Sequence, residues 1–276
     1  MKQFLLCTDL DRTLIPNGIQ PESPLAMERF RKLVGRSDVL LAYVTGRHRA
    51  LVEQAIEEYA LPQPDFVIAD VGTTIYLNEA SVWRAWQEWD ALIDQDWQGW
   101  THDDLGSLLS CWPALQLQET EKQACHKLSF YVALEVNAQD LIRSVDAQLM
   151  REGIRANLIW SIDEAIHKGL LDVLPASANK LHAIHFLMSK MGFDCDNTVF
   201  SGDSGNDLDV LLSDIPSVLV ANADAEIKSL VVDANRDTLY VAKGGYLGMN
   251  GNYSAGILEG VAHYWPGIVA NMNNFN

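Results

Sequence analysis

The sequence predicts an α/β protein, in which a doubly wound parallel sheet carries an inserted α+β domain. Three observations support this class. Short apolar runs alternate with segments of helical periodicity, several of the apolar runs end at acidic or hydroxyl side chains, and the middle of the chain differs in composition. Strands buried on both faces of a parallel sheet are almost continuously apolar, and ligands bind outside their carboxyl ends.

Six short apolar runs are predicted to be strands of this sheet, because each is shorter than a helix and is bounded by polar or glycine-rich turns. They are Phe4–Thr8, Val39–Val44, Phe66–Ala69, Thr198–Phe200, Ser217–Val220 and Leu239–Val241. Helical patterns are found at Pro24–Leu33, Arg49–Glu58, Ala178–Ser189, Asp207–Ser213 and Asp224–Leu230. This alternation predicts a parallel sheet with helices on both faces.

The segment between Asn78 and Leu174 predicts an inserted domain and contains seven of the eight tryptophans of the chain. Its periodicity predicts helices at Ser81–Ile93 and Ala138–Arg151, and strands at Lys127–Leu134, Ala156–Trp160 and Leu171–Leu174. We therefore assign residues 79–174 to the insert, and residues 1–78 and 175–276 to a core domain.

The charge balance narrows the range of partners. The 276 residues include 20 Lys plus Arg against 37 Asp plus Glu, which gives a net charge of −17. Such a field repels nucleic acid and anionic membranes, so we expect neither as a partner. The four cysteines form no CxxC pair, and no window approaches the ~18 apolar residues of a membrane span. These features predict reduced thiols and a cytoplasmic protein.

Acidic and hydroxyl side chains directly follow three of the predicted strands. The first strand ends at Asp9 and Asp11, whose spacing of two puts both carboxylates on one side of an extended chain. Alone, this pair would be typical of two solvated acids in a turn. The second strand, however, ends at Thr45-Gly46-Arg47, and a later one at Gly202-Asp203-Ser204-Gly205-Asn206-Asp207. The carboxyl ends of parallel strands share one edge, so we expect these groups to meet there.

The four carboxylates expected at this edge are Asp9, Asp11, Asp203 and Asp207. They would repel one another unless a cation lay among them. Carboxylate oxygens are the ligands that Mg²⁺ prefers, together with water and a substrate phosphate. The sequence therefore predicts a Mg²⁺ cofactor, and Mg²⁺, Lys180 and Arg47 would let a strongly acidic protein receive an anionic substrate.

These residues, in this order, resemble the four motifs of the haloacid dehalogenase superfamily of phosphatases. The match comprises Asp9-Leu10-Asp11-Arg12-Thr13, Thr45, Lys180 and the segment from Gly202 to Asp207. An insert between the second and third motifs is similar to the α/β cap of some members, and we call it the cap from here on. The resemblance implies a HAD-like, Rossmannoid core.

The chain is more specifically similar to sucrose-phosphate phosphatases, and this likeness covers most of its length. It is seen in Asp70-Val71-Gly72-Thr73, His126-Lys127-Leu128-Ser129-Phe130-Tyr131, Leu171-Asp172-Val173-Leu174-Pro175 and Ser254-Ala255-Gly256-Ile257-Leu258-Glu259-Gly260. The chain departs from the family at Asn179-Lys180-Leu181, where Gly-Lys-Gly is usual, and at Leu14-Ile15, where an aromatic residue is frequent. These departures bear on the identity of the sugar more than on the chemistry.

The resemblance implies a role for each matched residue. Asp9 would attack phosphorus and form an aspartyl phosphate, and Asp11 would act as general acid and then as general base. The metal would be held by Asp9, the backbone carbonyl of Asp11 and Asp203, with Asp207 acting through water. Phosphate or sugar contacts are expected from Thr45, Gly46, Arg47, Lys180, Asn206 and, in the cap, Lys127.

The predicted function is hydrolysis of sucrose 6-phosphate to sucrose and phosphate, with another sugar or disaccharide phosphate as the alternative. Two further hypotheses stay open: a phosphohexomutase-like phosphotransferase, and a silent interaction module that has kept the fold. A silent module predicts damaged motifs, whereas every motif residue is present. An association with the synthase that supplies the sugar phosphate also stays open. Lys127 and Ser129 fit a solvated sheet face as well as a ligand contact, and the tryptophans at 83, 86 and 89 fit core packing or a sugar platform.

Overall fold

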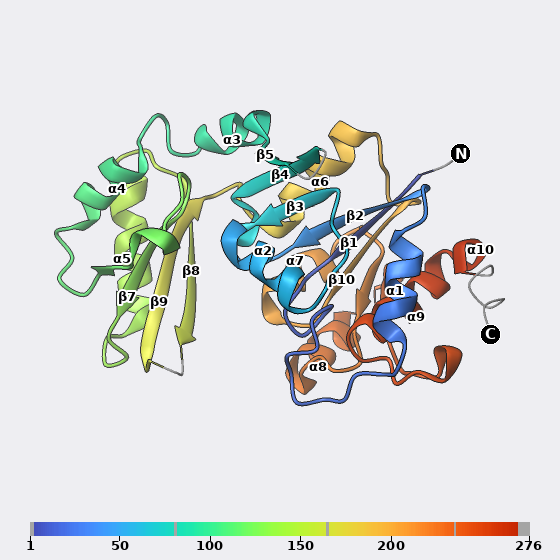
Figure 1. The fold of residues 1–276 in the computed structure, drawn as a ribbon. Helices are drawn as coiled ribbons and strands as arrows, with labels where there is room; N and C mark the ends of the chain where they lie inside the picture. Colours follow the sequence, from blue (N-terminus) through green and yellow to red (C-terminus); the bar gives the residue numbers. More distant parts are fainter. Residues whose placement is uncertain (1–2, 80–81, 164–165, 235, 270–276) are drawn as a thin grey trace.

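The structure is a computed structural model, which describes residues 3–79, 82–163, 166–234 and 236–269. It contains two sheets, a large one in the core and a small one in the cap (Figure 1). The large sheet has eight strands in the order β12-β11-β10-β1-β2-β3-β4-β5. Neighbours from β12 to β3 are parallel, while β4 and β5 continue the sheet as an antiparallel hairpin. The predicted doubly wound α/β class is confirmed.

The predicted strands of the core are all present, and their bounds differ from the prediction by at most two residues. They are β1 (Phe4–Thr8), β2 (Val39–Val44), β3 (Phe66–Ala69), β10 (Thr198–Gly202), β11 (Ser217–Leu219) and β12 (Leu239–Val241). Most of these residues are buried, as expected for strands covered on both faces. The chain runs outward from β1 to β3, then returns to the other side of β1 through β10. The switch point of the sheet therefore lies between β1 and β10.

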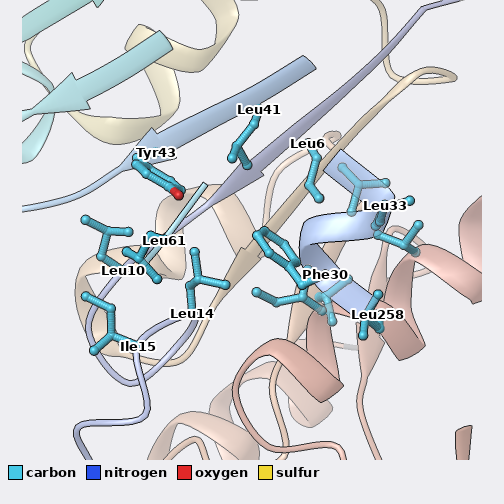
Figure 2. Close-up of a cluster of buried hydrophobic side chains, with 14 of the residues drawn as sticks. Leu6, Leu10, Leu14, Ile15, Phe30, Leu33, Leu41, Tyr43, Leu61 and Leu258 are labelled. Carbon is cyan, nitrogen blue, oxygen red and sulfur yellow. The ribbon is translucent and has the colours of Figure 1, made fainter. Parts of the chain in front are cut away.

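Helices cover both faces of the large sheet. One face packs against α1 (Ala26–Val34), α2 (Arg49–Glu58), α9 (Ser254–Tyr264) and α10 (Pro266–Val269). Figure 2 shows part of this layer, where Phe30, Leu33 and Leu258 meet Leu6 of β1. The other face packs against α3 (Gln87–Asp94), α6 (Lys180–Met191), α7 (Leu208–Leu211) and α8 (Ala225–Ala234). Each fully buried leucine contributes roughly 1.5–3 kcal/mol, so these two layers stabilise the sheet.

The cap contains a four-stranded antiparallel sheet in the order β6-β7-β9-β8. Its strands are β6 (Gln116–Leu117), β7 (Leu128–Val132), β8 (Ala156–Asp163) and β9 (Lys168–Pro175). The helices α4 (His102–Leu109) and α5 (Ala138–Arg151) pack on the side turned away from the large sheet (Figure 1). Leu128, Phe130 and Val132 point to these helices, so Ser129 and Tyr131 lie on the opposite face, toward the core.

The prediction of a helix over Ser81–Ile93 is wrong in its first half. Residues Val82–Ala85 form strand β5, which pairs with β4 (Thr74–Glu79), and the helix α3 begins only at Gln87; Ser81 itself lies outside the described residues. Trp83 and Trp89 are buried against the two faces of the large sheet, so packing accounts for both. Pairing with β4 overrides the helix-like spacing of the tryptophans. We therefore propose that the cap begins after α3 and not at residue 79.

The described part of the chain contains no helix that is both long and apolar enough to cross a membrane.

Candidate active site

The central strands bring the predicted groups to one edge of the large sheet. In the register of β1 with β10, Thr8 lies beside Ser201, and the amide of Asp9 donates to the Ser201 carbonyl over 2.9 Å. Asp9 and Asp203 therefore follow adjacent strands on the two sides of the switch point. On the other side of β1, β2 delivers Thr45, whose amide donates to Ile68 O of β3 over 2.8 Å.

Three carboxylates form a compact cluster at this edge. One oxygen each of Asp9, Asp203 and Asp207 can be chosen so that all three lie within 4.8 Å of one another, and all three residues are buried. The Oδ2 of Asp203 has no hydrogen-bond partner among the described residues, although it is buried. An oxygen-rich, buried cluster, in which one carboxylate oxygen accepts no hydrogen bond and has only a 3.5 Å ion pair with Arg12, fits a hard cation such as a divalent metal ion.

Lys180 joins the acids to one another. It is the first residue of α6, and its side chain is 2% exposed. Its Nζ donates to Asp207 Oδ1 over 2.7 Å, to Asp9 Oδ1 over 3.0 Å and to Asn206 Oδ1 over 3.3 Å. Asp207 is held further by the amides of Asp203 and Ser204, which donate to its Oδ2 over 3.1 and 3.2 Å. A single ammonium group thus binds residues that follow β1 and β10, and it sets the orientation of the Asp9 carboxylate.

The electrostatics of the cluster favour the binding of another cation. Burial raises the pKa of Asp9 to about 8, against the opposing effect of Lys180 and with a further increase from Asp207. Burial and then the charge of Asp207 raise the pKa of Asp203 to about 6. Lys180 and the half-exposed Arg12, which lies 3.5 Å from Asp203, leave three buried acids short of one positive charge. A divalent ion among the acids would favour their ionised forms.

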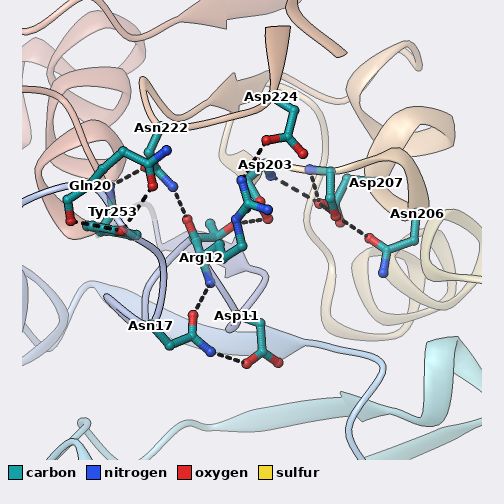
Figure 3. A network of polar contacts seen from close by, with 12 residues as sticks. Asp11, Arg12, Asn17, Gln20, Asp203, Asn206, Asp207, Asn222, Asp224 and Tyr253 are labelled. Carbon is teal, nitrogen blue, oxygen red and sulfur yellow. Dashed lines mark hydrogen bonds and ion pairs between the residues drawn. The ribbon is translucent and has the colours of Figure 1, made fainter. Parts of the chain in front are cut away.

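Asp11 lies apart from this cluster and is held by two other residues. Arg47 Nε donates to Asp11 Oδ2 over 2.8 Å, a second guanidinium nitrogen donates to Oδ1 over 2.6 Å, and Asn17 Nδ2 donates to Oδ1 over 2.7 Å (Figure 3 shows the Asn17 contact). Burial would raise the pKa of Asp11, but the hydrogen bonds and charge of Arg47, helped by Asn17, hold it below its usual value. The Asp11 carboxylate is therefore ionised in this arrangement.

Arg12, Thr13 and Asn17 contact the predicted acids, although no role for their side chains was predicted from the sequence. Thr13 Oγ1 donates to Asp203 Oδ1 over 2.9 Å, and Arg12 Nε lies 3.5 Å from Asp203 Oδ2. Arg12 has a left-handed backbone, with φ 57°, and is fixed by its amide, which donates to Asn17 Oδ1 (Figure 3). A site contact of Thr13 could have been predicted from its place two residues after Asp11. Nothing in the sequence around Asn17 indicates a contact with the site.

The second predicted segment forms a tight turn beside the carboxylates. The Thr45 side chain is buried, and its Oγ1 accepts a hydrogen bond from the amide of Arg47 over 3.2 Å. At Gly46, an added Cβ would have Val71 Cγ2 as its nearest neighbour, at 3.8 Å, so space is available above the turn. This geometry suits a backbone that approaches a ligand closely.

Lys127 immediately precedes β7 in the cap and contacts the core directly. Its Nζ is 3.3 Å from Asp70 Oδ1, with side chains that are 11% and 5% exposed. The structure therefore pairs this predicted ligand residue with an acid that follows β3. Asp70 belongs to a segment that the family resemblance includes, but no role was predicted for it.

Comparison with known proteins connects this geometry to a family. The model of the sucrose-6F-phosphate phosphohydrolase family matches residues 2–265. A protein of Nitrosococcus oceani, described as a HAD-like hydrolase, is 51% identical over 271 residues, which are 96% of this chain and 73% of that protein. A probable sucrose-phosphatase 2 of Arabidopsis thaliana is 30% identical over 95% of this chain, but the chain spans only 60% of that protein's length.

A solved structure extends the comparison to three dimensions. The sucrose-phosphatase of Synechocystis sp., in complex with sucrose and phosphate, superimposes with a TM-score of 0.74 at 26% identity, over 96% of this chain and 98% of the other. This agreement includes both the large sheet and the cap, since it covers nearly the whole of each chain. The resemblance found in the motifs is confirmed. The chain belongs to the sucrose-6F-phosphate phosphohydrolase family of haloacid dehalogenase-like hydrolases and is a phosphoric monoester hydrolase.

Proposed function

We propose that the protein hydrolyses sucrose 6-phosphate to sucrose and phosphate with Mg²⁺ as cofactor. The observation that carries this proposal is the buried cluster in which Lys180 holds Asp9 beside Asp203 and Asp207. It combines a positioned carboxylate nucleophile with oxygen ligands for a cation. The sugar is inferred from family membership and from the sucrose-bound relative of the same fold.

In the first step, an oxygen of Asp9 attacks phosphorus while the bond from phosphorus to the sugar oxygen breaks. The product is an aspartyl phosphate, and the sugar oxygen leaves with a proton from Asp11. Lys180, Thr45 and Asn206 would hold the phosphate oxygens that do not react. Positioning and neutralisation of charge contribute most of the catalysis in phosphoryl transfer, which is consistent with a site made of acids and fixed cations.

In the second step, water attacks phosphorus and Asp11 accepts its proton, which regenerates Asp9 and releases orthophosphate. The present pairing of Asp11 with Arg47 suits an ionised base and not an acid. Arg47 must therefore leave Asp11 before Asp11 can protonate the leaving group. The phosphate dianion of a substrate is a competing partner for Arg47, because guanidinium groups bind phosphate in a two-pronged geometry.

Asp9 and Asp203, with the carbonyl of Asp11, are the groups that would hold Mg²⁺, and Asp207 would act through water. When bound, the ion would neutralise the charge of the transferring phosphoryl group. We expect Asp203→Asn to weaken Mg²⁺ binding at least ~10-fold, the lower limit of what loss of even an outer partner costs a metal site. Isothermal titration of metal-free protein with Mg²⁺ measures this directly, without any substrate.

Asp224→Asn is the matched control for this experiment, because it removes the same charge. Asp224 contacts the same Arg12, over 2.8 Å, but its side chain is 59% exposed and it is not part of the cluster. Its affinity for Mg²⁺ should stay within about twofold of the wild type, since exposed charges are screened. Equal losses in the two variants would show that net charge, and not ligation by Asp203, governs metal binding.

The cap offers the groups that would recognise a sugar. On the face turned to the core, Ser129 Oγ donates to Asp172 Oδ1 over 2.5 Å, and the Ser129 amide donates to Gln123 Oε1 over 2.8 Å. Tyr131 OH donates to Glu119 over 2.8 Å and accepts from Lys122 over 2.6 Å. Buried or half-buried hydroxyl, carboxylate and amide groups of this kind discriminate strongly between ligands that match their hydrogen bonds and ligands that do not.

We expect sucrose 6-phosphate to be hydrolysed at least ~100-fold more efficiently, in kcat/KM, than glucose 6-phosphate or fructose 6-phosphate. This ratio corresponds to ~2.7 kcal/mol of transition-state stabilisation from the second sugar ring. Initial rates of phosphate release from a panel of esters measure it, with a second disaccharide phosphate included. If a monosaccharide phosphate is hydrolysed equally well, the sucrose assignment fails. Transfer of phosphate between sugars, with none released to water, would indicate the mutase alternative instead.

A further inference from the structure

A strained loop follows β3, between the two domains. Asp70 and Val71 both have left-handed backbones, with φ 49° and 61°, and Gly72 follows with φ 102°. Left-handed geometry is rare outside glycine, and it is least tolerated by a β-branched residue such as valine. Strain of this kind persists only where the surroundings impose it, and it is concentrated at functional sites.

This loop contacts both phosphate-binding segments of the core. The amide of Val71 donates to Thr45 O over 3.1 Å, and the amide of Asp70 donates to Arg47 O over 3.0 Å. Gly72 packs on the start of α6, where an added Cβ would lie 2.4 Å from the Asn179 carbonyl carbon and 2.9 Å from the Lys180 amide. A displacement of the loop would therefore move Thr45, Arg47 and Lys180 together.

The same loop is attached to the cap by one buried ion pair. The carboxylate of Asp70 accepts from Lys127 Nζ over 3.3 Å, and both side chains are close to fully buried. Lys127 precedes Ser129 on the cap face that is turned to the core. A charge pair buried at a domain boundary is well formed only at one relative position of the domains, because separation would leave each charge uncompensated.

We propose that Asp70 is a positioning residue, which couples the position of the cap to Thr45, Arg47 and Lys180 through its ion pair with Lys127. The inference rests on the proposed function, in which the cap closes over a phosphate held by those groups. According to this proposal, Lys127 affects the phosphate-binding residues through Asp70, in addition to any contact that it makes with the sugar. Closure of the cap and ordering of the phosphate site then become one event.

The test uses Asp70→Asn, Lys127→Gln and the double variant. Asparagine has nearly the shape of aspartate and tolerates a left-handed backbone, so the loop is kept while the charge is lost. Two quantities are measured: the Kd of orthophosphate in saturating Mg²⁺, and the distance between spin labels on Cys111 of the cap and on a cysteine replacing Glu57 of α2. The labelled protein carries Cys125→Ser and Cys195→Ser, while Cys7 is buried.

Each single variant should raise the Kd of orthophosphate ~5-fold or more and should broaden the distance distribution toward an open cap. The double variant should stay within about twofold of the single variants, because both remove one interaction. Asp38→Asn is the control, since it removes the partly buried Arg36–Asp38 pair, which precedes the amino end of β2, and should change neither quantity. If Asp70→Asn does not fold, the two quantities are compared between Lys127→Gln and the wild type.

Unchanged distances and affinities in the single variants, or effects that add in the double variant, would overturn the coupling. Neither measurement involves a sugar or a turnover. A failure of the sucrose assignment would therefore leave this result standing, and a failure of the coupling would leave the substrate panel unaffected.

Discussion

Replacing Asp9 with asparagine should reduce the turnover of sucrose 6-phosphate by at least ~10³, because a neutral amide oxygen is a far weaker nucleophile toward phosphorus than a carboxylate. The substitution changes little else. Asn has the same shape, and its carbonyl oxygen can still accept from Lys180, which now contacts Asp9 Oδ1 over 3.0 Å. Initial rates of phosphate release, compared with the thermal unfolding midpoint of the variant, separate loss of chemistry from loss of fold.

A second measurement identifies the covalent step. Acid quenching of the wild type during turnover should leave protein with the added mass of one phosphoryl group, carried by the peptide that contains Asp9. The Asp9→Asn variant should show no such species. If Asp9→Asn retains more than a tenth of wild-type activity, Asp9 is not the nucleophile, whether or not the variant binds metal.

The edge of the sheet could be predicted from the sequence because its parts are local. β1, β2 and β3 have the bounds predicted from their apolar runs, and the runs of β1 and β2 are followed at once by predicted residues of the site. The rule that parallel strands end at one edge then brings Asp9, Thr45 and Asp203 together without knowledge of any contact. Lys180 was predicted from the family resemblance, and in the structure its ammonium group donates three hydrogen bonds from the start of α6, to Asp9, Asn206 and Asp207.

What the sequence did not predict depends on contacts between distant residues or on competition between patterns. Arg47 and Asp11 are 36 residues apart. The sequence predicted acid–base catalysis for the Asp11 carboxylate and a phosphate contact for Arg47, and nothing in it indicated that the two side chains pair with each other. Asp70 and Lys127 are 57 residues apart and belong to different domains. At Val82–Ala85 a spacing of three between tryptophans favoured a helix, while pairing with β4 produced a strand.

The substitution Lys180→Met should destabilise the metal-free protein by about 3–5 kcal/mol, because it leaves buried carboxylates without their cation. Methionine keeps the length and the apolar stem of lysine, so packing is nearly conserved. The side chains of Lys180, Asp9 and Asp207 are 2%, 7% and 0% exposed, which leaves water little access to compensate the charge. Urea unfolding at neutral pH in the presence of a chelator measures the free energy of unfolding without interference from a bound metal.

The same helix provides the control. Lys190 lies in the last turn of α6 and pairs with Glu88, with side chains that are 42% and 62% exposed. Lys190→Met removes an identical charge from a solvated pair, so its free energy of unfolding should change by no more than ~0.5 kcal/mol. Similar losses in the two variants would mean that the charge of α6, and not the buried network, explains the effect.

A second substitution shows whether the unpaired acids cause the loss. Asp207→Asn added to Lys180→Met removes one of the uncompensated charges while keeping acceptance from the amides of Asp203 and Ser204. It should recover more than ~1 kcal/mol, since an unpaired buried charge costs more than a neutral group of the same shape. If the free energy of unfolding does not recover, the stabilising effect of Lys180 comes from the packing of its side chain and not from its charge. Catalysis should be lost in both variants, because neither holds Asp9 and the transferring phosphate with a fixed cation.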